Sequence, residues 1–164
     1  MNFTALNETE LPVLRQLAFS IWHAHYPAII SAAQIDYMLD RMFAPEALRA
    51  DLADGVQWEF AWHEDRRVGF LSMVHDAKTR QLKLSKLYLL PELHGRGLGQ
   101  EMLARVKACA RTAGARQVHL TVNKRNAIAI RAYQKAGFQI TGETVADIGG
   151  GYVMDDFVMT WEVS

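Results

Sequence analysis

The stretch Leu93–Gln100, LHGRGLGQ, places three glycines between an apolar segment and an amphipathic one. Few side-chain atoms cover the main chain at such a cluster, and a helix that starts there leaves several N–H groups without intrahelical partners. These donors and the aligned peptide dipoles favour a phosphate or pyrophosphate group. The stretch therefore predicts a turn that binds a phosphate-bearing ligand.

The flanking segments predict a strand before the glycines and a helix after them. Residues 82–90 are mostly apolar and are followed by Pro91, as is typical of a strand that ends there. Downstream, apolar residues share one side of a helix that Gly114 is expected to end: Leu98, Met102, Leu103, Val106, Ala110 and Ala113. A dinucleotide fingerprint would need glycine in place of Gln100 or Met102, and a P-loop would need a Gly-Lys-Ser/Thr ending, so neither motif is present.

The hexapeptide 94–99, HGRGLG, resembles the coenzyme A pyrophosphate loop of the GCN5-related N-acetyltransferases, Q/R-x-x-G-x-G/A. In that family the loop acts chiefly through main-chain amides, so histidine at the first position changes one side-chain contact and leaves the site intact. The resemblance implies cofactor contacts from the following residues: His94, Gly95, Arg96, Gly97, Leu98, Gly99 and Gln100.

A second segment carries the same resemblance. Residues 123–138, NKRNAIAIRAYQKAGF, are similar to the family signature N-x-x-A-x-x-x-Y-x-x-x-G-F, with Asn126, Ala129, Tyr133, Gly137 and Phe138 in the matching places. The residues themselves predict a helix here, because asparagine is a good N-cap and a glycine can end a helix in a left-handed conformation. The resemblance is strong from about residue 68 to the C-terminus and weak before it.

The resemblance implies an α/β fold, with residues 1–164 forming one N-acetyltransferase domain. The expected architecture is a mixed, strongly twisted sheet with helices on both faces and a split between two central strands. Hydrophobic periodicity, caps and turn residues place the elements as follows. Strands are expected at residues 2–6, 56–63, 67–74, 82–90, 118–122, 138–146 and 157–163, with a turn at Asp65–Arg66; helices are expected at 11–21, from Ser31 to Met42, and at 45–54.

The alternation of apolar residues shifts by one position within the strand before the glycine loop. Leu82 and Leu84 share one parity whereas Leu87 and Leu89 share the other, which indicates a bulge near Ser85–Lys86 or a strand buried on both faces. The flanking motifs favour the bulge, which would splay this strand from the strand at 118–122. The resemblance then implies that main-chain groups of Leu87, Tyr88 and Leu89 pair with the pantetheine arm, as an added strand does.

The resemblance also implies the chemistry, which is direct attack of an amine on the thioester of acetyl-CoA within a ternary complex. Tyr133 matches the family's general acid, and Asn126 matches its cofactor-contacting asparagine. The general base stays open. An alkyl ammonium is only about a thousandth deprotonated at pH 7, and Ser85 stands where many relatives carry glutamate. A water chain, Glu59, Asp36 or an acceptor of low pKa remain alternatives.

The composition limits the classes of binding partner that can be expected. The 164 residues suffice for one domain with a sizeable core, and the 18 basic and 18 acidic side chains cancel, so no attraction to nucleic acid or to an anionic membrane is expected. No apolar run is long enough to span a bilayer, and no signal-peptide pattern is seen. The single cysteine, Cys109, is expected in the core, and a cytoplasmic location is the default. The oligomeric state stays open, a homodimer included.

Two features of the sequence bear on the identity of the acceptor. The segment 141–159 is similar to the spermidine/spermine acetyltransferase-like branch, and acids such as Asp155 and Asp156 suit a cationic amine. The first two helices are expected to cover the acceptor site, and the expected acceptor residues are Trp22, Tyr26, Asp36 and Glu59. A protein N-terminal or lysine acetyltransferase and a non-catalytic acyl-CoA sensor remain alternatives. No metal is expected, because the His23-x-His25 pair lacks a second pair at ligand spacing.

Overall fold

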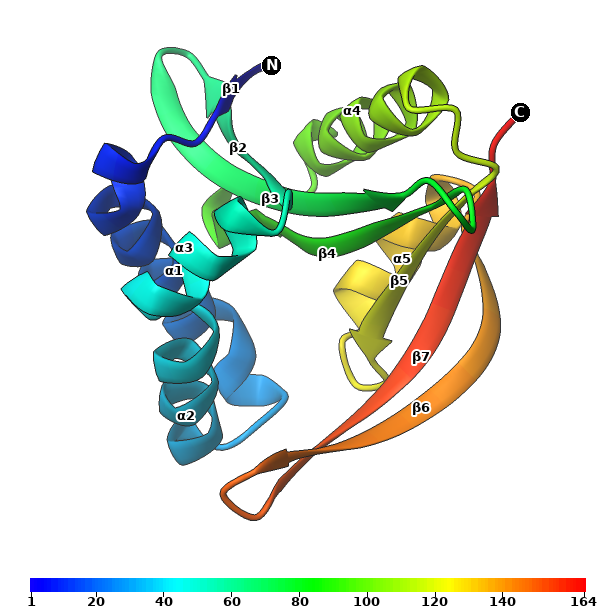
Figure 1. Cartoon of the computed structure of the whole chain (residues 1–164). Helices are drawn as coiled ribbons and strands as arrows, with labels where there is room; N and C mark the ends of the chain where they lie inside the picture. The colour runs from blue at the N-terminus through cyan, green and yellow to red at the C-terminus, as the bar shows by residue number, and fades with distance from the viewer. The chain divides into compact units, whose positions relative to one another are not determined.

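A computed structural model describes residues 1–164 as an α/β fold built on a seven-stranded mixed sheet (Figure 1). The hydrogen-bonded strand order is β1-β2-β3-β4-β5-β7-β6. The strands are β1 (Asn2–Ala5), β2 (Gln57–His63), β3 (Arg66–Asp76), β4 (Gln81–Leu89), β5 (Gln117–Asn123), β6 (Gln139–Gly149) and β7 (Tyr152–Glu162). The helices are α1 (Leu11–His25), α2 (Ala32–Met42), α3 (Pro45–Ala53), α4 (Leu98–Thr112) and α5 (Ala127–Lys135), with short 3-10 turns η1 (Glu8–Glu10), η2 (Tyr26–Ala28) and η3 (Pro91–Leu93). The expected α/β class and mixed sheet are confirmed.

The chain divides into two compact units. The first contains residues 1–72 and 86–98, and the second contains residues 73–85 and 99–164. Strands β3 and β4 pass from one unit into the other, so each unit holds part of both strands. No helix combines the length and apolar character that crossing a bilayer would require.

The first unit is built around a row of aromatic rings. Trp22 of α1 lies 6.1 Å from Phe43, Phe43 lies 6.2 Å from Trp58 of β2, and Trp58 lies 6.1 Å from Phe70 of β3, measured between ring centroids. All four side chains are at most 2% exposed. Edge and offset contacts of this kind add to the free energy of apolar burial. The row therefore fixes α1 and the segment after α2 on one face of β2 and β3.

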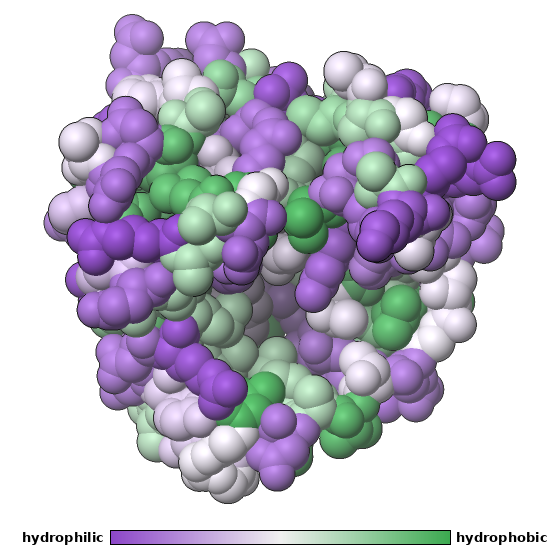
Figure 2. Space-filling model, viewed as in Figure 1, coloured by the Kyte–Doolittle hydropathy of each residue, from purple (hydrophilic) through white to green (hydrophobic).

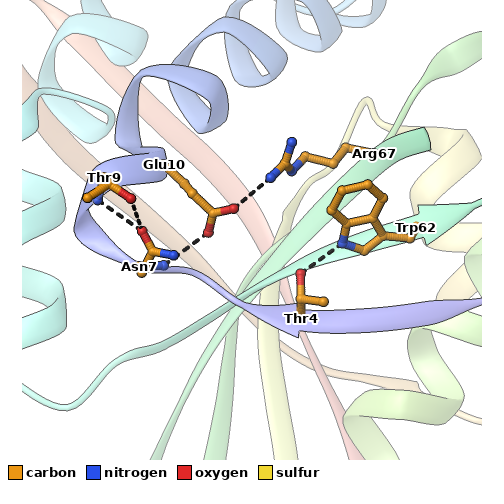
Figure 3. Close-up of polar contacts among 6 residues, drawn as sticks. All are labelled: Thr4, Asn7, Thr9, Glu10, Trp62 and Arg67. Carbon is orange, nitrogen blue, oxygen red and sulfur yellow. Dashed lines mark hydrogen bonds and ion pairs between the residues drawn. The ribbon is translucent and has the colours of Figure 1, made fainter. Parts of the chain in front are cut away.

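Polar contacts hold the entry to α1, as Figure 3 shows. Asn7 caps η1 in a capping box with Glu10, and Glu10 also accepts a hydrogen bond from Arg67 Nη2 at 2.6 Å. Trp62 Nε1 donates to Thr4 Oγ1 at 2.8 Å across the β1–β2 pair. These contacts join the first strand to β2 and β3, so the expected first strand is confirmed.

Local signals set most boundaries of the helices. Ser31 Oγ accepts from Gln34 N at 3.1 Å and caps α2, and Gly55, Gly114 and Gly137 follow α3, α4 and α5 with positive φ. The expected turn at Asp65–Arg66 is wrong by one residue, because the left-handed residues are Glu64 and Asp65, with φ of 50° and 60°.

The second unit packs α4 and α5 on the sheet formed by β5, β7 and β6. Apolar residues of α4 and of the strands are buried together: Met102, Leu103, Val106, Ala110, Val118, Leu120, Val122, Phe138 and Met159. Gln100 Nε2 donates to Ala132 O at 2.9 Å, and Lys107 Nζ donates to Ala136 O, so α4 holds α5 by two side-chain bonds. Figure 1 shows β6 and β7 as a long hairpin, and its backbone pairing reaches Gly149. Strand β6 therefore ends three residues later than expected, at residue 149, and starts one residue later, at residue 139.

Strand β4 shows the expected change of phase. Leu82 and Leu84 are buried, and the next buried residue of the strand is Leu89, of opposite parity. Parallel pairing with β5 joins Gln81–Lys83 to Gln117–His119. At the other end of the strand, Leu90 N donates to Val68 O at 2.8 Å. A β4 that is held at both ends and changes phase between them agrees with a bulge near Ser85–Lys86.

Gly69 of β3 lies unusually close to this part of β4. A Cβ atom at this position would come within 2.3 Å of Tyr88 O, so an alanine must displace main chain. We expect Gly69→Ala to lower the free energy of unfolding by about 1–3 kcal/mol. Denaturant unfolding would measure this loss. Gly142→Ala is the matched strand control, because its Cβ would meet Val158 Cβ at an ordinary 3.8 Å. Equal stability of the two variants would contradict the close approach.

Candidate functional site

The glycine loop exposes main chain at the start of α4. Gly95 and Gly97 adopt φ of 78° and 82°, a region that disfavours other residues, and no atom lies within 4 Å of a Cβ built on either one. Gly97 directly precedes Leu98, the first residue of α4. Gly95, Arg96 and Gly97 are exposed, whereas the side chain of Leu98 is buried. The loop therefore offers free space and helix N-terminal N–H groups, as a pyrophosphate site requires.

His94 stabilises this loop from within the first unit. Its Nε2 atom lies 3.1 Å from Leu89 O, and because a carbonyl can only accept, Nε2 carries the hydrogen. The ring also meets His25 of α1 edge to face, with 5.9 Å between centroids. The side chain at the first loop position thus ties the loop to the end of β4. The main-chain carbonyl of Leu89 is engaged by this bond.

Three aromatic side chains meet beside that strand. Trp22 lies 4.4 Å from Tyr26 and 5.6 Å from Tyr88, measured between ring centroids, and the hydroxyls of Tyr26 and Tyr88 are 3.4 Å apart. Trp22 Nε1 is buried without a hydrogen-bond partner. The structure thus brings together two of the expected acceptor residues and adds Tyr88, which the sequence suggested only for its main chain. Leu87 and Tyr88 are half-buried and Leu89 is buried.

The other two expected acceptor residues, Asp36 and Glu59, do not join this aromatic cluster. The side chain of Asp36 is 66% exposed and pairs with His23 Nε2 at 3.0 Å. Hydrogen bonds to Phe19 O and to this carboxylate raise the pKa of His23. Glu59 is 4% exposed and accepts from Gln57 Nε2 at 2.6 Å. It projects from the face of β2 opposite to Trp58, so it does not join the aromatic cluster.

Helix α5 carries the second signature in the second unit. Asn126 is 6% exposed, and its Oδ1 accepts from Ala129 N at 3.3 Å, which confirms the expected N-cap. Tyr133 is half-buried, with its ring 5.9 Å from Phe138. Gln100, expected at the cofactor, uses its amide to hold Ala132 O. Ser85 is exposed.

The adjacent acids of β7 have different surroundings. Asp155 is 56% exposed, and Lys124 Nζ pairs with it at 2.8 Å and with Glu143 at 3.0 Å. Asp156 is 6% exposed, and one of its carboxylate oxygens has no partner. The cation of Lys124 neutralises the charge of Asp155, which leaves Asp156 as a candidate functional group. The sequence carries no signal for this difference, because the distinguishing partners come from β6 and from the segment after β5.

The remaining polar candidates show no common site. His23 pairs with Asp36 and His25 packs against His94, so the two histidines of the H-x-H pair have different neighbours. Cys109 is only partly buried, whereas the sequence suggested a core position. On the face that Figure 2 shows, hydrophilic and hydrophobic residues are both present. The described geometry thus offers an open glycine loop at a helix N-terminus, a phenol and a buried carboxylate.

Comparisons with known proteins show which family the chain resembles. The model of the Acetyltransferase (GNAT) family matches residues 17–138. An uncharacterized N-acetyltransferase of Mycobacterium tuberculosis is 39% identical over 103 residues, which are 63% of this chain and 65% of that protein. The match therefore spans somewhat less than two thirds of the length of that relative.

Two further relatives extend the comparison. The spermine/spermidine N(1)-acetyltransferase of Bacillus subtilis is 34% identical over 80 residues, covering 48% of this chain and 51% of that protein. Among solved structures, the PaiA N-acetyltransferase of Thermoplasma acidophilum, in complex with coenzyme A, superposes with a TM-score of 0.78. Its sequence identity is 22%, and the superposition covers 99% of both chains. That likeness shows the fold alone.

Proposed function

Because the chain belongs to the GCN5-related N-acetyltransferase (GNAT) family, we propose that it transfers the acetyl group of acetyl-CoA to a primary amine. The glycine loop is the observation that carries this proposal. Its two left-handed glycines and the open space around them suit the pyrophosphate of coenzyme A, and α4 starts directly after them. The coenzyme A complex of the Thermoplasma protein supports the same cofactor.

The roles of the other residues follow from the two family segments. Main-chain groups of residues 94–99 would bind the pyrophosphate, and main-chain groups of Leu87 and Tyr88 would pair with the pantetheine arm. Leu89 would contribute its N–H, because its carbonyl already accepts from His94. Asn126 would contact the cofactor near the start of α5. The phenol of Tyr133 would protonate the departing thiolate.

Acetyl transfer then needs no metal and no covalent enzyme intermediate. The amine nitrogen attacks the thioester carbonyl, the C–S bond breaks, and sulfur takes the phenolic proton. The proton that nitrogen loses then restores the phenol. Because the protein would hold the thioester and the amine together, much of the entropic cost of bringing them into contact is removed. The protein supplies this orientation together with the proton transfers.

For the acceptor, we propose a small cationic amine such as a polyamine. About half of the chain aligns with the Bacillus spermine/spermidine enzyme, and two features suit an alkyl ammonium. The rings of Trp22, Tyr26 and Tyr88 form a face of the kind that attracts cations. Asp156 supplies a buried carboxylate oxygen without a donor.

The test compares three acceptors at equal concentration: spermidine, an N-terminal peptide and a lysine peptide. We expect spermidine to have the highest kcat/KM, and we expect that value to fall as salt screens the attraction between the amine and the carboxylates. Release of free thiol from acetyl-CoA measures turnover. A peptide preferred by more than about tenfold would contradict the small-amine proposal and leave acetyl transfer intact.

A non-catalytic sensor is the candidate of a different class. The exposed Ser85, at the place where many relatives carry glutamate, is the observation that favours it. Such a protein would bind acetyl-CoA with an affinity that calorimetry can measure but would release no thiol with any amine of the panel. Turnover well above the rate without protein would exclude it.

A further inference from the structure

Asp156 projects from the face of the β5–β7–β6 sheet that α4 and α5 leave uncovered. Trp161 marks the covered face, because its ring lies 4.6 Å from Lys107 Nζ and 6.5 Å from the ring of Phe138. β5 and β7 pair without a register shift from Gln117↔Glu162 to Asn123↔Asp156. Side chains alternate along a strand, so Asp156, five residues before Trp161, points to the opposite face.

The buried carboxylate of Asp156 lacks part of the hydrogen bonding that water would give it. The hydroxyl of Thr121 donates to the carboxylate, but the Oδ1 atom is out of contact with solvent and has no partner. An unpaired oxygen on a carboxylate that is 6% exposed lowers stability, because its lost hydration is not replaced. No group of the chain thus donates a hydrogen bond to Asp156 Oδ1.

The charges around Asp156 leave its carboxylate basic. Burial, and then the adjacent Asp155, raise its pKa, while Thr121 and Lys124 act in the opposite direction. Lys124 is shared between Asp155 and Glu143 and therefore compensates Asp156 only in part. On the same face, burial and Lys83 lower the pKa of His119, so that imidazole adds little positive charge at neutral pH.

The carboxylate also lies beside the start of α5. Asp156 pairs with Asn123, the last residue of β5, and Asn126 N donates to Asn123 O at 2.9 Å. Asn126 is the N-cap of α5, the helix that carries the proposed acid Tyr133. The backbone thus connects the buried carboxylate directly to the helix of the second family segment.

From this geometry we propose that Asp156 is the general base, with Oδ1 accepting a hydrogen bond from the acceptor ammonium and then one of its protons. The proposal rests on the proposed acetyl transfer. The N–H bond breaks with its electron pair kept on nitrogen, and that pair forms the new N–C bond. As the C–S bond breaks, sulfur takes the proton of Tyr133, and the second proton released by nitrogen restores the phenol. Asp156 returns its proton to solvent, so protons and electrons balance.

The test compares Asp156→Asn with its neighbour, Asp155→Asn. Asparagine keeps the size of the side chain and an oxygen that can accept from Thr121, but it cannot take a proton. We expect Asp156→Asn to lower kcat by about 10²- to 10⁴-fold and to abolish the acidic limb of the profile of kcat/KM against pH. Asp155→Asn should keep that limb and a kcat near that of the unmodified protein. Acetyl-CoA affinity, measured by calorimetry, should be unchanged in both variants.

A stability measurement separates a base from a structural anchor. The pKa of Asp156 is raised in the folded chain, so the folded chain holds this proton more tightly than the unfolded chain does. The protonated carboxyl therefore adds to the free energy of unfolding at low pH, and this contribution is lost as the pH rises through the folded pKa. Removing the charge should therefore raise the Tm of Asp156→Asn at about pH 7–8, and the gain should vanish near about pH 4. A lower Tm at neutral pH would identify Asp156 as a structural anchor.

The outcomes distinguish the two proposals. If the unmodified protein turns over no amine, the proposed function fails, and the role of Asp156 fails with it. If the unmodified protein is active and Asp156→Asn is equally active, or keeps the acidic limb, only the role of Asp156 is overturned. Loss of activity with a raised Tm and an unchanged acetyl-CoA affinity is the result that supports it.

Discussion

Replacing Tyr133 with phenylalanine should lower kcat by about 10²- to 10⁴-fold, the range expected for the loss of a general acid. The thiolate of coenzyme A leaves with a negative charge, and the phenol is the group that we propose to neutralise it. Because the substitution removes a single hydroxyl, the ring keeps its 5.9 Å contact with Phe138. The affinity for acetyl-CoA should barely change, so that kcat and kcat/KM fall together.

The experiment needs a control for the loss of a tyrosine hydroxyl. Tyr152→Phe is suitable, because Tyr152 is also half-buried and belongs to the same unit but lies outside both family segments. We expect its turnover to match that of the unmodified protein. Thermal unfolding of both variants shows whether packing is intact. A Tyr133→Phe variant with unchanged turnover would assign the tyrosine to the packing of α5.

The helices could be predicted because their signals are local. Ser31 and Asn126 cap α2 and α5 through bonds to residues only three positions away, and Gly114 and Gly137 end helices with positive φ. The expected turn lies one residue too late, at Asp65–Arg66, because non-glycine residues adopt the left-handed conformation at Glu64 and Asp65, and composition does not mark such a case. The extra length of β6 comes from its pairing with β7, a partner in the hairpin that periodicity in β6 alone cannot show.

The parts of the candidate site that lie in contiguous sequence motifs could be predicted. The glycine loop and the α5 segment are such motifs, and the structure gives the loop its left-handed glycines and α5 its capping asparagine. Side-chain partners across the fold could not be read from the sequence. Lys124 neutralises Asp155 but leaves the buried oxygen of Asp156 without a donor, although the two acids are adjacent in the chain.

The same limit applies to the expected acceptor residues. Trp22 and Tyr26 do meet, and Tyr88 joins them from β4, but alternation along β2 directs Glu59 to the opposite face from Trp58. Asp36 lies on the surface beside His23. A sequence can list the carboxylates of a chain, but the face that each occupies depends on strand register and on helix packing.

Replacing Gly97 with valine should weaken acetyl-CoA binding by about 10²- to 10³-fold, equal to roughly 3–4 kcal/mol. Valine is branched at Cβ and strongly disfavours the φ of 82° that Gly97 adopts, so the loop must change its course. The new side chain also fills the open space next to the N-terminus of α4. Several charge-assisted hydrogen bonds to a pyrophosphate would be lost together, which explains the size of the effect.

Gly55→Val separates the loss of binding from backbone strain. Gly55 has φ of 81°, lies in the turn between α3 and β2, and likewise has no atom within 4 Å of the position that a Cβ atom would take. Both variants should therefore lose a similar amount of stability, about 1–2 kcal/mol for a left-handed residue with a side chain. Only Gly97→Val should lose acetyl-CoA affinity in calorimetry. Equal affinities in the two folded variants would exclude residues 94–99 as the pyrophosphate site, because strain at Gly97 would then have no effect on the ligand.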